Sequence, residues 1–157
     1  MKSNKLTDTS LLTARIILGT VIAGHGAQKL LGWFGGYGFE GTMGFFTGTV
    51  GLPYILAFLI ILAESLGMIA LIFGFASRLI STSLILIMLG AIVTTHGQFG
   101  FFMNWSGAQA GEGCEFHLLV IALSAVISLN GAGAYSLDAH LRSRLEQRRG
   151  IVYALFN

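Results

Sequence analysis

The sequence predicts an all-α membrane protein, a bundle of four transmembrane helices with long aromatic, Gly-rich outer loops. Hydrophobic residues make up 54% of the 157 residues and charged residues only 10%, whereas soluble domains carry roughly 25% charged residues. The mean hydropathy is +0.77. Glycine is abundant (22) and proline nearly absent (1), which favours closely packed membrane helices because small residues let backbones approach.

Four segments have the roughly 20 mostly apolar residues that a helix needs to cross the hydrocarbon. They are residues 11–31, 53–75, 79–96 and 115–133. Pro53 suits the first turn of a helix, and the Gly-rich stretch from Gly131 is expected to end the fourth span. Residues 1–139 are therefore one predicted membrane domain, and residues 140–157 are a charged cytoplasmic tail helix.

The positive charges indicate the orientation. All but one fall at the N-terminus, between the second and third spans, or at the C-terminus: Lys2, Lys5, Arg15, Arg78, Arg142, Arg144, Arg148 and Arg149. The other two loops contain only Lys29 between them. Because cytoplasmic loops are enriched in Lys and Arg, we expect both termini in the cytoplasm and the tail helix against anionic lipid headgroups. The net charge of +2 says nothing about nucleic acid, and no such partner is expected.

The two outer loops, residues 32–51 and 97–113, are unusually aromatic. They contain Trp33, Phe34, Tyr37, Phe39, Phe45, Phe46, Phe99, Phe101, Phe102 and Trp105. One interpretation is an aromatic belt at the lipid–water boundary. The other is a lid folded over a pocket, since loops this long and apolar rarely remain in water. A short interfacial helix is expected near residues 42–49.

Polar residues inside predicted spans are candidates for a site, because ionisable groups in a membrane are costly and face the interior of the bundle. The candidates are His25, Gln28, Lys29, Glu64, His96, Glu115 and His117. All but Glu64 lie near the outer ends of their spans. Glu64 lies about eleven residues into the second span, roughly 16 Å at 1.5 Å per residue, close to the bilayer centre. In the fourth span His117 belongs to a small, polar stripe with Ser124 and Ser128, so we expect it to point inward.

Simpler roles exist for these residues. Lys29 and Arg15 can extend to the headgroups, Glu115 can cap its helix, and the whole group can be a buried polar network that fixes how the helices pack. A transition metal or haem bound by His25, His96, His117 and Glu64 is chemically possible. However, the sequence has no HxxxH or ExxH pair, and Cys114 is its only cysteine. The alternative is a cleft open to lipid, where the same groups bond to quinone carbonyls and move protons.

Several motifs together resemble the DoxX family of small bacterial membrane proteins. They are Arg15-x3-Gly19-x5-His25-Gly26-x-Gln28-Lys29-Leu30, Glu64-x2-Gly67-x3-Leu71-x2-Gly74-x2-Ser77-Arg78, His96 followed by Gly100-Phe101-Phe102, Glu115-Phe116, and the closing Gly131-Ala-Gly-Ala-Tyr135-Ser-Leu-Asp138. In the last motif Ala132 replaces the proline usual in the family. His117 lies outside the common pattern, so only the stripe in the fourth span supports a role for it.

The resemblance implies a membrane subunit of a quinone-linked oxidoreductase or redox-stress assembly in a bacterial cytoplasmic membrane. The family takes its name from a subunit of an archaeal thiosulfate:quinone oxidoreductase. We expect quinone as the ligand. The expected partners are the lipid bilayer and either a redox subunit or a second copy of the chain. Two alternatives remain: a non-enzymatic membrane anchor or assembly factor, and a small-molecule or ion carrier built around Glu64.

Overall fold

The computed structural model describes residues 4–156, and the side chains of residues 4–146. Every regular element in this part of the chain is helical, which confirms the predicted all-α class. The helices are α1 (Lys5–Leu31), α2 (Gly38–Gly44), α3 (Tyr54–Leu62), α4 (Met68–Phe73), α5 (Ser77–Ala91), α6 (Glu115–Asn130) and α7 (Leu137–Phe156). Short 3₁₀ turns are η1 (Trp33–Gly35) and η5 (Gly97–Phe99), and π-helical turns are η2 (Phe45–Thr49), η3 (Ala63–Gly67) and η4 (Ile92–His96).

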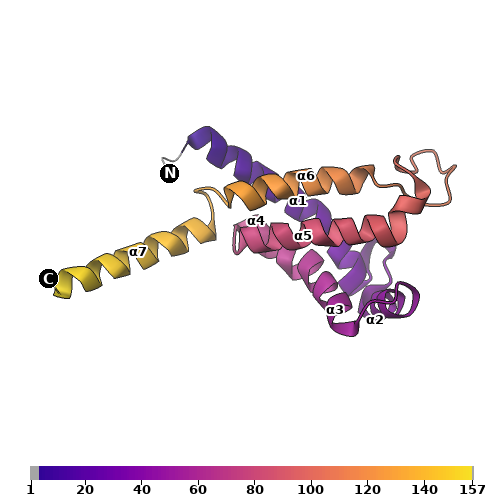
Figure 1. Ribbon diagram of the computed structural model, residues 1–157, viewed down its shortest axis with the longest axis horizontal. Helices are drawn as coiled ribbons and strands as arrows, with labels where there is room; N and C mark the ends of the chain where they lie inside the picture. Colours follow the sequence, from indigo (N-terminus) through magenta and orange to yellow (C-terminus); the bar gives the residue numbers. More distant parts are fainter. Residues whose placement is uncertain (1–3, 157) are drawn as a thin grey trace.

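The bundle consists of two helix pairs (Figure 1). In one pair α1 packs against η3 and α4, and in the other α5 packs against α6. Three continuous helices are long and apolar enough to cross a membrane: Lys5–Leu31, Tyr54–Phe73 and Ser77–Phe99. The fourth, α6, has 16 residues and is shorter than predicted, because it ends at Asn130 where Gly131 has a φ of +84°.

Four helices contribute to the main hydrophobic core. Leu18 and Ile22 come from α1, Met68 and Leu71 from α4, Leu84 and Met88 from α5, and Val120 and Ile127 from α6. Glycines on α1 allow close packing against the second span. A Cβ at Gly26 would lie 2.1 Å from the carbonyl oxygen of Glu64, and one at Gly19 would lie 2.5 Å from Ile72 Cγ1. Only glycine therefore lets α1 approach η3 this closely.

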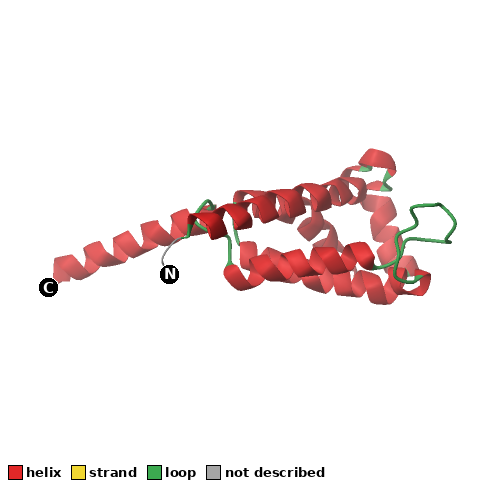
Figure 2. Cartoon of the chain, turned by 90° about the horizontal axis from the view of Figure 1, so that it is seen from above, coloured by secondary structure: helices red, strands yellow, loops and turns green. Residues whose placement is uncertain are grey.

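Both described termini lie at the same end of the bundle, which we call the tail end (Figure 2). It contains the start of α1, the turn 74–76 and the segment 131–136. Arg15 is fully buried there, so it does not take the simpler role of extending to the headgroups. Its guanidinium instead donates to the carbonyl oxygens of Leu71 (3.3 Å), Ile72 (3.0 Å) and Tyr135 (2.6 Å). These oxygens belong to the C-terminal turn of α4 and to residues 131–136, so Arg15 fastens three segments together.

Asp138, in the first turn of α7, fastens the tail helix to the same end. Its carboxylate accepts the backbone N–H groups of Ala76 (2.8 Å) and Ser77 (2.9 Å), and its own N–H donates to Gly74 O (2.9 Å). The carboxylate thus caps the start of α5, where N–H groups lack helical partners. α7 begins at Leu137 rather than 140 and extends away from the bundle (Figure 1).

Candidate functional site

A cavity of about 540 Å³ lies between the two helix pairs, at the end opposite the tail end. We call this the loop end, because residues 32–53 and 97–114 form it. The cavity walls are largely apolar. The lining residues are Ile22, His25, Lys29, Phe45, Phe46, Val50, Leu52, Leu56, Ile60, Glu64, Leu86, Ile87, Met88, Gly90, Ala91, Thr94, Thr95, His96, Met103, Glu112, Phe116 and His117. A mostly apolar cavity with a few convergent polar groups is the usual form of a small-molecule site.

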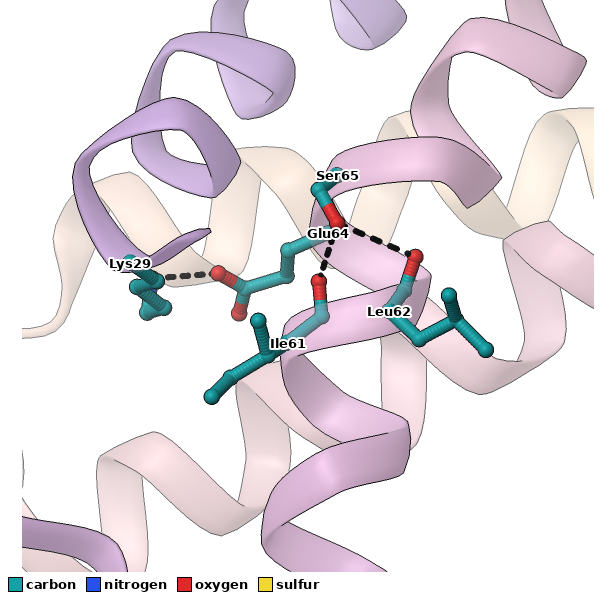
Figure 3. Close-up of polar contacts among 5 residues, drawn as sticks. All are labelled: Lys29, Ile61, Leu62, Glu64 and Ser65. Atoms are coloured by element: carbon teal, nitrogen blue, oxygen red, sulfur yellow. Dashed lines mark hydrogen bonds and ion pairs between the residues drawn. The ribbon is translucent and has the colours of Figure 1, made fainter. Parts of the chain in front are cut away.

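An ion pair joins the first two spans inside this cavity (Figure 3). The Lys29 ammonium donates to the Glu64 carboxylate. The Glu64 side chain is 4% exposed and that of Lys29 is 26% exposed. The prediction that Glu64 faces packed helices is therefore confirmed, and Lys29 points to Glu64 rather than only to headgroups. A carboxylate this deep in the bundle needs such a partner, because an isolated buried charge is strongly unfavourable.

Three imidazoles also line the cavity, each from a different span. The rings of His96 and His117 lie in contact, with centroids 4.1 Å apart and planes at 43°. The ring of His25 lies tilted against that of Phe116, with ring centroids 5.7 Å apart and planes at 52°. His96 Nδ1 is hydrogen-bonded to the carbonyl oxygen of Glu112 at 2.9 Å. The rings are thus held in place by one another, by an aromatic side chain and by a loop carbonyl.

His117 has an unsatisfied nitrogen. The residue is 7% exposed, and its Nδ1 is a buried atom with no hydrogen-bond partner among the described residues. A buried polar atom without a partner is unfavourable by roughly 1–3 kcal/mol. His117 thus lines the cavity with one ring nitrogen that makes no hydrogen bond within the described part of the chain.

The three π-helical turns all border the cavity. η2 contributes Phe45 and Phe46, η3 contributes Glu64, and η4 contributes Thr94, Thr95 and His96. A π turn shifts hydrogen bonds to i→i+5 and disturbs the ladder of carbonyl partners, and such turns are frequent at functional sites. Each turn here contains a hydroxyl that donates to a backbone carbonyl four residues earlier: Thr47 to Met43 (2.8 Å), Ser65 to Ile61 (2.6 Å) and Thr94 to Gly90 (2.8 Å).

The aromatic loop residues divide between the two interpretations of the sequence. Phe45 and Phe46 line the cavity, together with the aliphatic loop residue Met103, which is the behaviour expected of a lid. Trp33, Phe34, Tyr37 and Trp105 are exposed, by 59%, 75%, 85% and 85%, which is the behaviour expected of an interfacial belt. The expected short helix near residues 42–49 is present as the end of α2 and η2.

The structure brings His25, Lys29, Glu64, His96 and His117 together at the cavity but places the other two candidates elsewhere. Gln28 does not line the cavity, and its amide donates to the carbonyl oxygen of Phe34 (3.3 Å). Glu115 also lies outside the lining. Its Oε1 accepts the backbone N–H of Met103 (2.9 Å) and the indole N–H of Trp105 (3.1 Å), so it organises the second loop.

Some lining residues were not singled out from the sequence. Glu112 lies in the Gly-rich loop just before the fourth span, and Thr94 and Thr95 lie within the third. Threonines in a span ordinarily bond to their own backbone, so composition offered no reason to select them. The sequence Thr94-Thr95-His96 is a run of polar residues at a span end, and this was the one available signal.

A metal site receives no support from the geometry. Among the described residues, no three His, Cys, Asp or Glu side chains are placed to hold one metal ion. His25, His96 and His117 line the same cavity, but Glu64 is already paired with Lys29. The arrangement instead offers imidazole nitrogens, an ammonium and a carboxylate around an apolar space, which suits a neutral, flat molecule with polar oxygens.

Two comparisons with known proteins give matches. The sequence model of the DoxX family matches residues 10–97. A protein of Bacillus subtilis (strain 168) named Putative oxidoreductase CatD is 31% identical over 135 residues, which cover 86% of this chain and 89% of that protein. No solved structure gives a significant match.

Proposed function

Because the chain belongs to the DoxX family of membrane proteins, we propose that it is a multi-pass membrane subunit that binds a quinone in its cavity. The reaction class is redox chemistry linked to the quinone pool. The Bacillus relative, whose name describes it as a candidate oxidoreductase, supports this class. The observation that carries the proposal is the convergence of His25, His96, His117 and the Lys29–Glu64 pair on one apolar cavity.

The residues present fit a quinone headgroup. A quinone is a flat apolar ring with two carbonyl oxygens that need hydrogen-bond donors. The imidazole of His117 lines the cavity, and a ring nitrogen that carries the proton can donate to one of them. The aromatic rings of Phe46 and Phe116, which line the same cavity, can pack against the ring faces.

When bound, a quinone supplies reversible two-electron, two-proton chemistry. The chain's own contribution is to bind and orient the ring and to exchange protons at its oxygens. His25, His96 and His117 would be the proton donors and acceptors. Lys29 would stabilise negative charge on a ring oxygen, and Glu64 holds Lys29 in position. Glu115, one of the candidates selected from the sequence, is better suited to hold the loop over the cavity.

Electrons require a further component. The cavity side chains named above move protons but not electrons, so the proposal includes a donor, either a partner redox subunit or a bound redox group. We place the protein in the bacterial cytoplasmic membrane with both termini cytoplasmic, following the Lys and Arg distribution. The cavity then lies in the outer half of the bilayer.

The rival proposal is that the polar cluster only holds helices together in an anchor or assembly factor. Five buried side-chain atoms of the described residues lack a hydrogen-bond partner, and His117 Nδ1 is the one whose residue lines the cavity. The convergence of three imidazoles on that apolar cavity is what favours a ligand over a purely structural network. A carrier built around Glu64 is the other rival, and the Lys29 ion pair makes that carboxylate unavailable to a transported cation.

The test is to purify the full chain in mild detergent, extract the bound lipids and quantify quinone per protein, with a visible spectrum and metal analysis on the same sample. Quinone at close to one per chain would support the proposal. A protein that carries none, and that does not bind added quinone in a titration, would refute it. Flux into proteoliposomes that depends on Glu64 would then support the carrier instead.

A further inference from the structure

Several cavity-lining residues are also exposed on the apolar outer surface of the bundle. Leu56 on α3 is 45% exposed and Leu86 on α5 is 64% exposed, although both line the cavity. Gly90, one turn beyond Leu86, is exposed as well and lines the same space. A side chain that faces both a cavity and the outside lies at an opening, so these residues mark a mouth between α3 and α5.

The helix packing explains why the mouth is there. α5 packs against η3 and α4 but not closely against α3, and α3 runs away from α5 towards α2 in Figure 1. The second span contains η3, the π turn that carries Glu64. The two helix pairs are therefore together at the tail end and apart at the loop end, with the mouth between them.

The surroundings of the mouth are those of a lipid-facing surface. Ile55 and Leu59 on α3 are 72% and 50% exposed, Leu89 on α5 is 46% exposed, and Val93 on η4 is 85% exposed. These helices are long and apolar enough to lie in a membrane. The mouth therefore opens sideways into the hydrocarbon, while Phe45, Phe46 and Met103 from the loops line the cavity at the loop end.

We infer that the cavity takes an amphiphilic ligand, a polar head on a long apolar tail, which enters from the bilayer between α3 and α5. This inference rests on the proposed function, and it specifies a lipid-soluble quinone rather than a water-soluble one. The head reaches His117 and the Lys29–Glu64 pair, and the tail stays in the mouth along Leu56, Leu86 and Gly90. Exclusion from water favours the apolar tail at this apolar opening.

Gly90 provides the test, because a Cβ there would meet no atom within 4 Å. Gly90→Phe places a bulky side chain at the mouth from a Cβ that is itself free of contacts. The matched control is Leu89→Phe on the neighbouring residue, which is exposed but does not line the cavity. Two probes are titrated into each purified protein at equilibrium: a benzoquinone with a ten-carbon alkyl tail, and the same headgroup without the tail.

We expect Gly90→Phe to weaken binding of the tailed probe about tenfold or more and to change binding of the tail-free probe by less than about twofold. Leu89→Phe should change neither. Equal weakening of both probes by Gly90→Phe, or no weakening of the tailed probe, would overturn the inference.

A second measurement separates this inference from the proposed function. With Trp33→Phe and Trp105→Phe as background, Phe46→Trp places one fluorophore in the cavity lining. The protein is placed in vesicles of phospholipids whose acyl chains carry bromine, which quenches tryptophan fluorescence on contact. Quenching of this tryptophan should decrease when Gly90→Phe is added, because the substitution blocks the mouth through which acyl chains reach the cavity. If quenching falls but no quinone binds the unsubstituted protein, the mouth is supported and the quinone assignment fails. If quenching does not respond to Gly90→Phe, the lateral mouth is refuted.

Discussion

The imidazole rings of His96 and His117 lie in contact, with their centroids 4.1 Å apart. They come from opposite ends of the second loop, which folds back so that Glu112 O bonds to His96 Nδ1 at 2.9 Å. His96 is therefore anchored by the loop, whereas Nδ1 of His117 has no partner. One ring of the pair is thus held in place, and the other has bonding capacity for a ligand.

The first prediction concerns His117. His117→Phe keeps a ring of similar shape and removes the unsatisfied nitrogen, so the melting temperature should stay the same or rise. Quinone affinity should nevertheless fall about tenfold, the usual size of one lost hydrogen bond to a ligand. Titration with the tailed benzoquinone and thermal unfolding in detergent measure the two effects.

The matched control for this variant is His140→Phe. His140 is exposed on α7 at the tail end, so its replacement should alter neither affinity nor stability noticeably. If His117→Phe keeps full affinity, or if His140→Phe loses as much, the histidine cluster is not the binding site.

The second prediction concerns the Lys29–Glu64 pair. Lys29→Met removes the partner of a carboxylate that is 4% exposed, and it should lower the free energy of unfolding by about 3 kcal/mol. The double variant Lys29→Met/Glu64→Met removes both charges and should recover most of that loss. Unfolding by titration with sodium dodecyl sulfate measures both, and additive losses in the double variant would contradict the pairing.

The third prediction concerns the glycines of α1. Gly26→Ala should destabilise the protein by about 1–3 kcal/mol, because the new Cβ would lie 2.1 Å from the backbone oxygen of Glu64. Gly24→Ala is the control, since its Cβ would meet nothing within 4 Å. Alanine is the better helix former, so Gly24→Ala should be neutral or stabilising by up to about 1 kcal/mol. The reverse order of melting temperatures would contradict the packing of α1 on η3.

The fourth prediction concerns Arg15. Arg15→Met removes a fully buried guanidinium and leaves the carbonyl groups of Leu71, Ile72 and Tyr135 without the donor that they have now, and it should destabilise the protein by about 3 kcal/mol or more. Arg78→Met is the control, because Arg78 is exposed and its guanidinium donates to Ser128 O (2.9 Å). Replacing Arg78 should lower the free energy of unfolding by less than about 1 kcal/mol. Comparable losses of stability in the two variants would mean that the hydrogen bonds of Arg15 do not hold the tail end together.

The fifth prediction concerns orientation. In a Cys114→Ser background, Gln109→Cys in the second loop should react with a membrane-impermeant maleimide in intact spheroplasts. Ser143→Cys on α7 should react only after the membrane is opened. The reverse pattern would place the cavity in the cytoplasmic half of the membrane and would overturn the proposed topology.

Much of the fold was predictable from local sequence. The apolar segments predicted helices, and the helices are present, because burial of an apolar segment in lipid requires its backbone to bond internally. The inward direction of His117 also followed from a stripe along one helix, and both His117 and Ser124 are buried. Arg15 was less predictable. Its guanidinium donates to carbonyl oxygens more than fifty residues away along the chain. A pattern of neighbouring residues cannot predict such a contact.

The identity of the residues that line the cavity was predictable only in part. Gln28 and Glu115 were selected with the others because they share a depth in the membrane, but their side chains bond to loop backbone instead. Glu112, Thr94 and Thr95 were passed over although they line the cavity. Depth follows from position along a span, whereas the direction of a side chain relative to its neighbours depends on helix crossing and on the π turns.

By itself the sequence determined that this chain forms apolar helices with a small set of polar groups near one end of the bundle. Hydropathy and helical periodicity depend on residues close together in the sequence, so helices can be predicted from short segments. Only the tertiary structure decided that Lys29 pairs with Glu64, that His96 contacts His117, and that α3 parts from α5 to leave a mouth. These contacts join residues about 20 to 35 positions apart, and they depend on how whole helices cross and on where glycines allow them to touch.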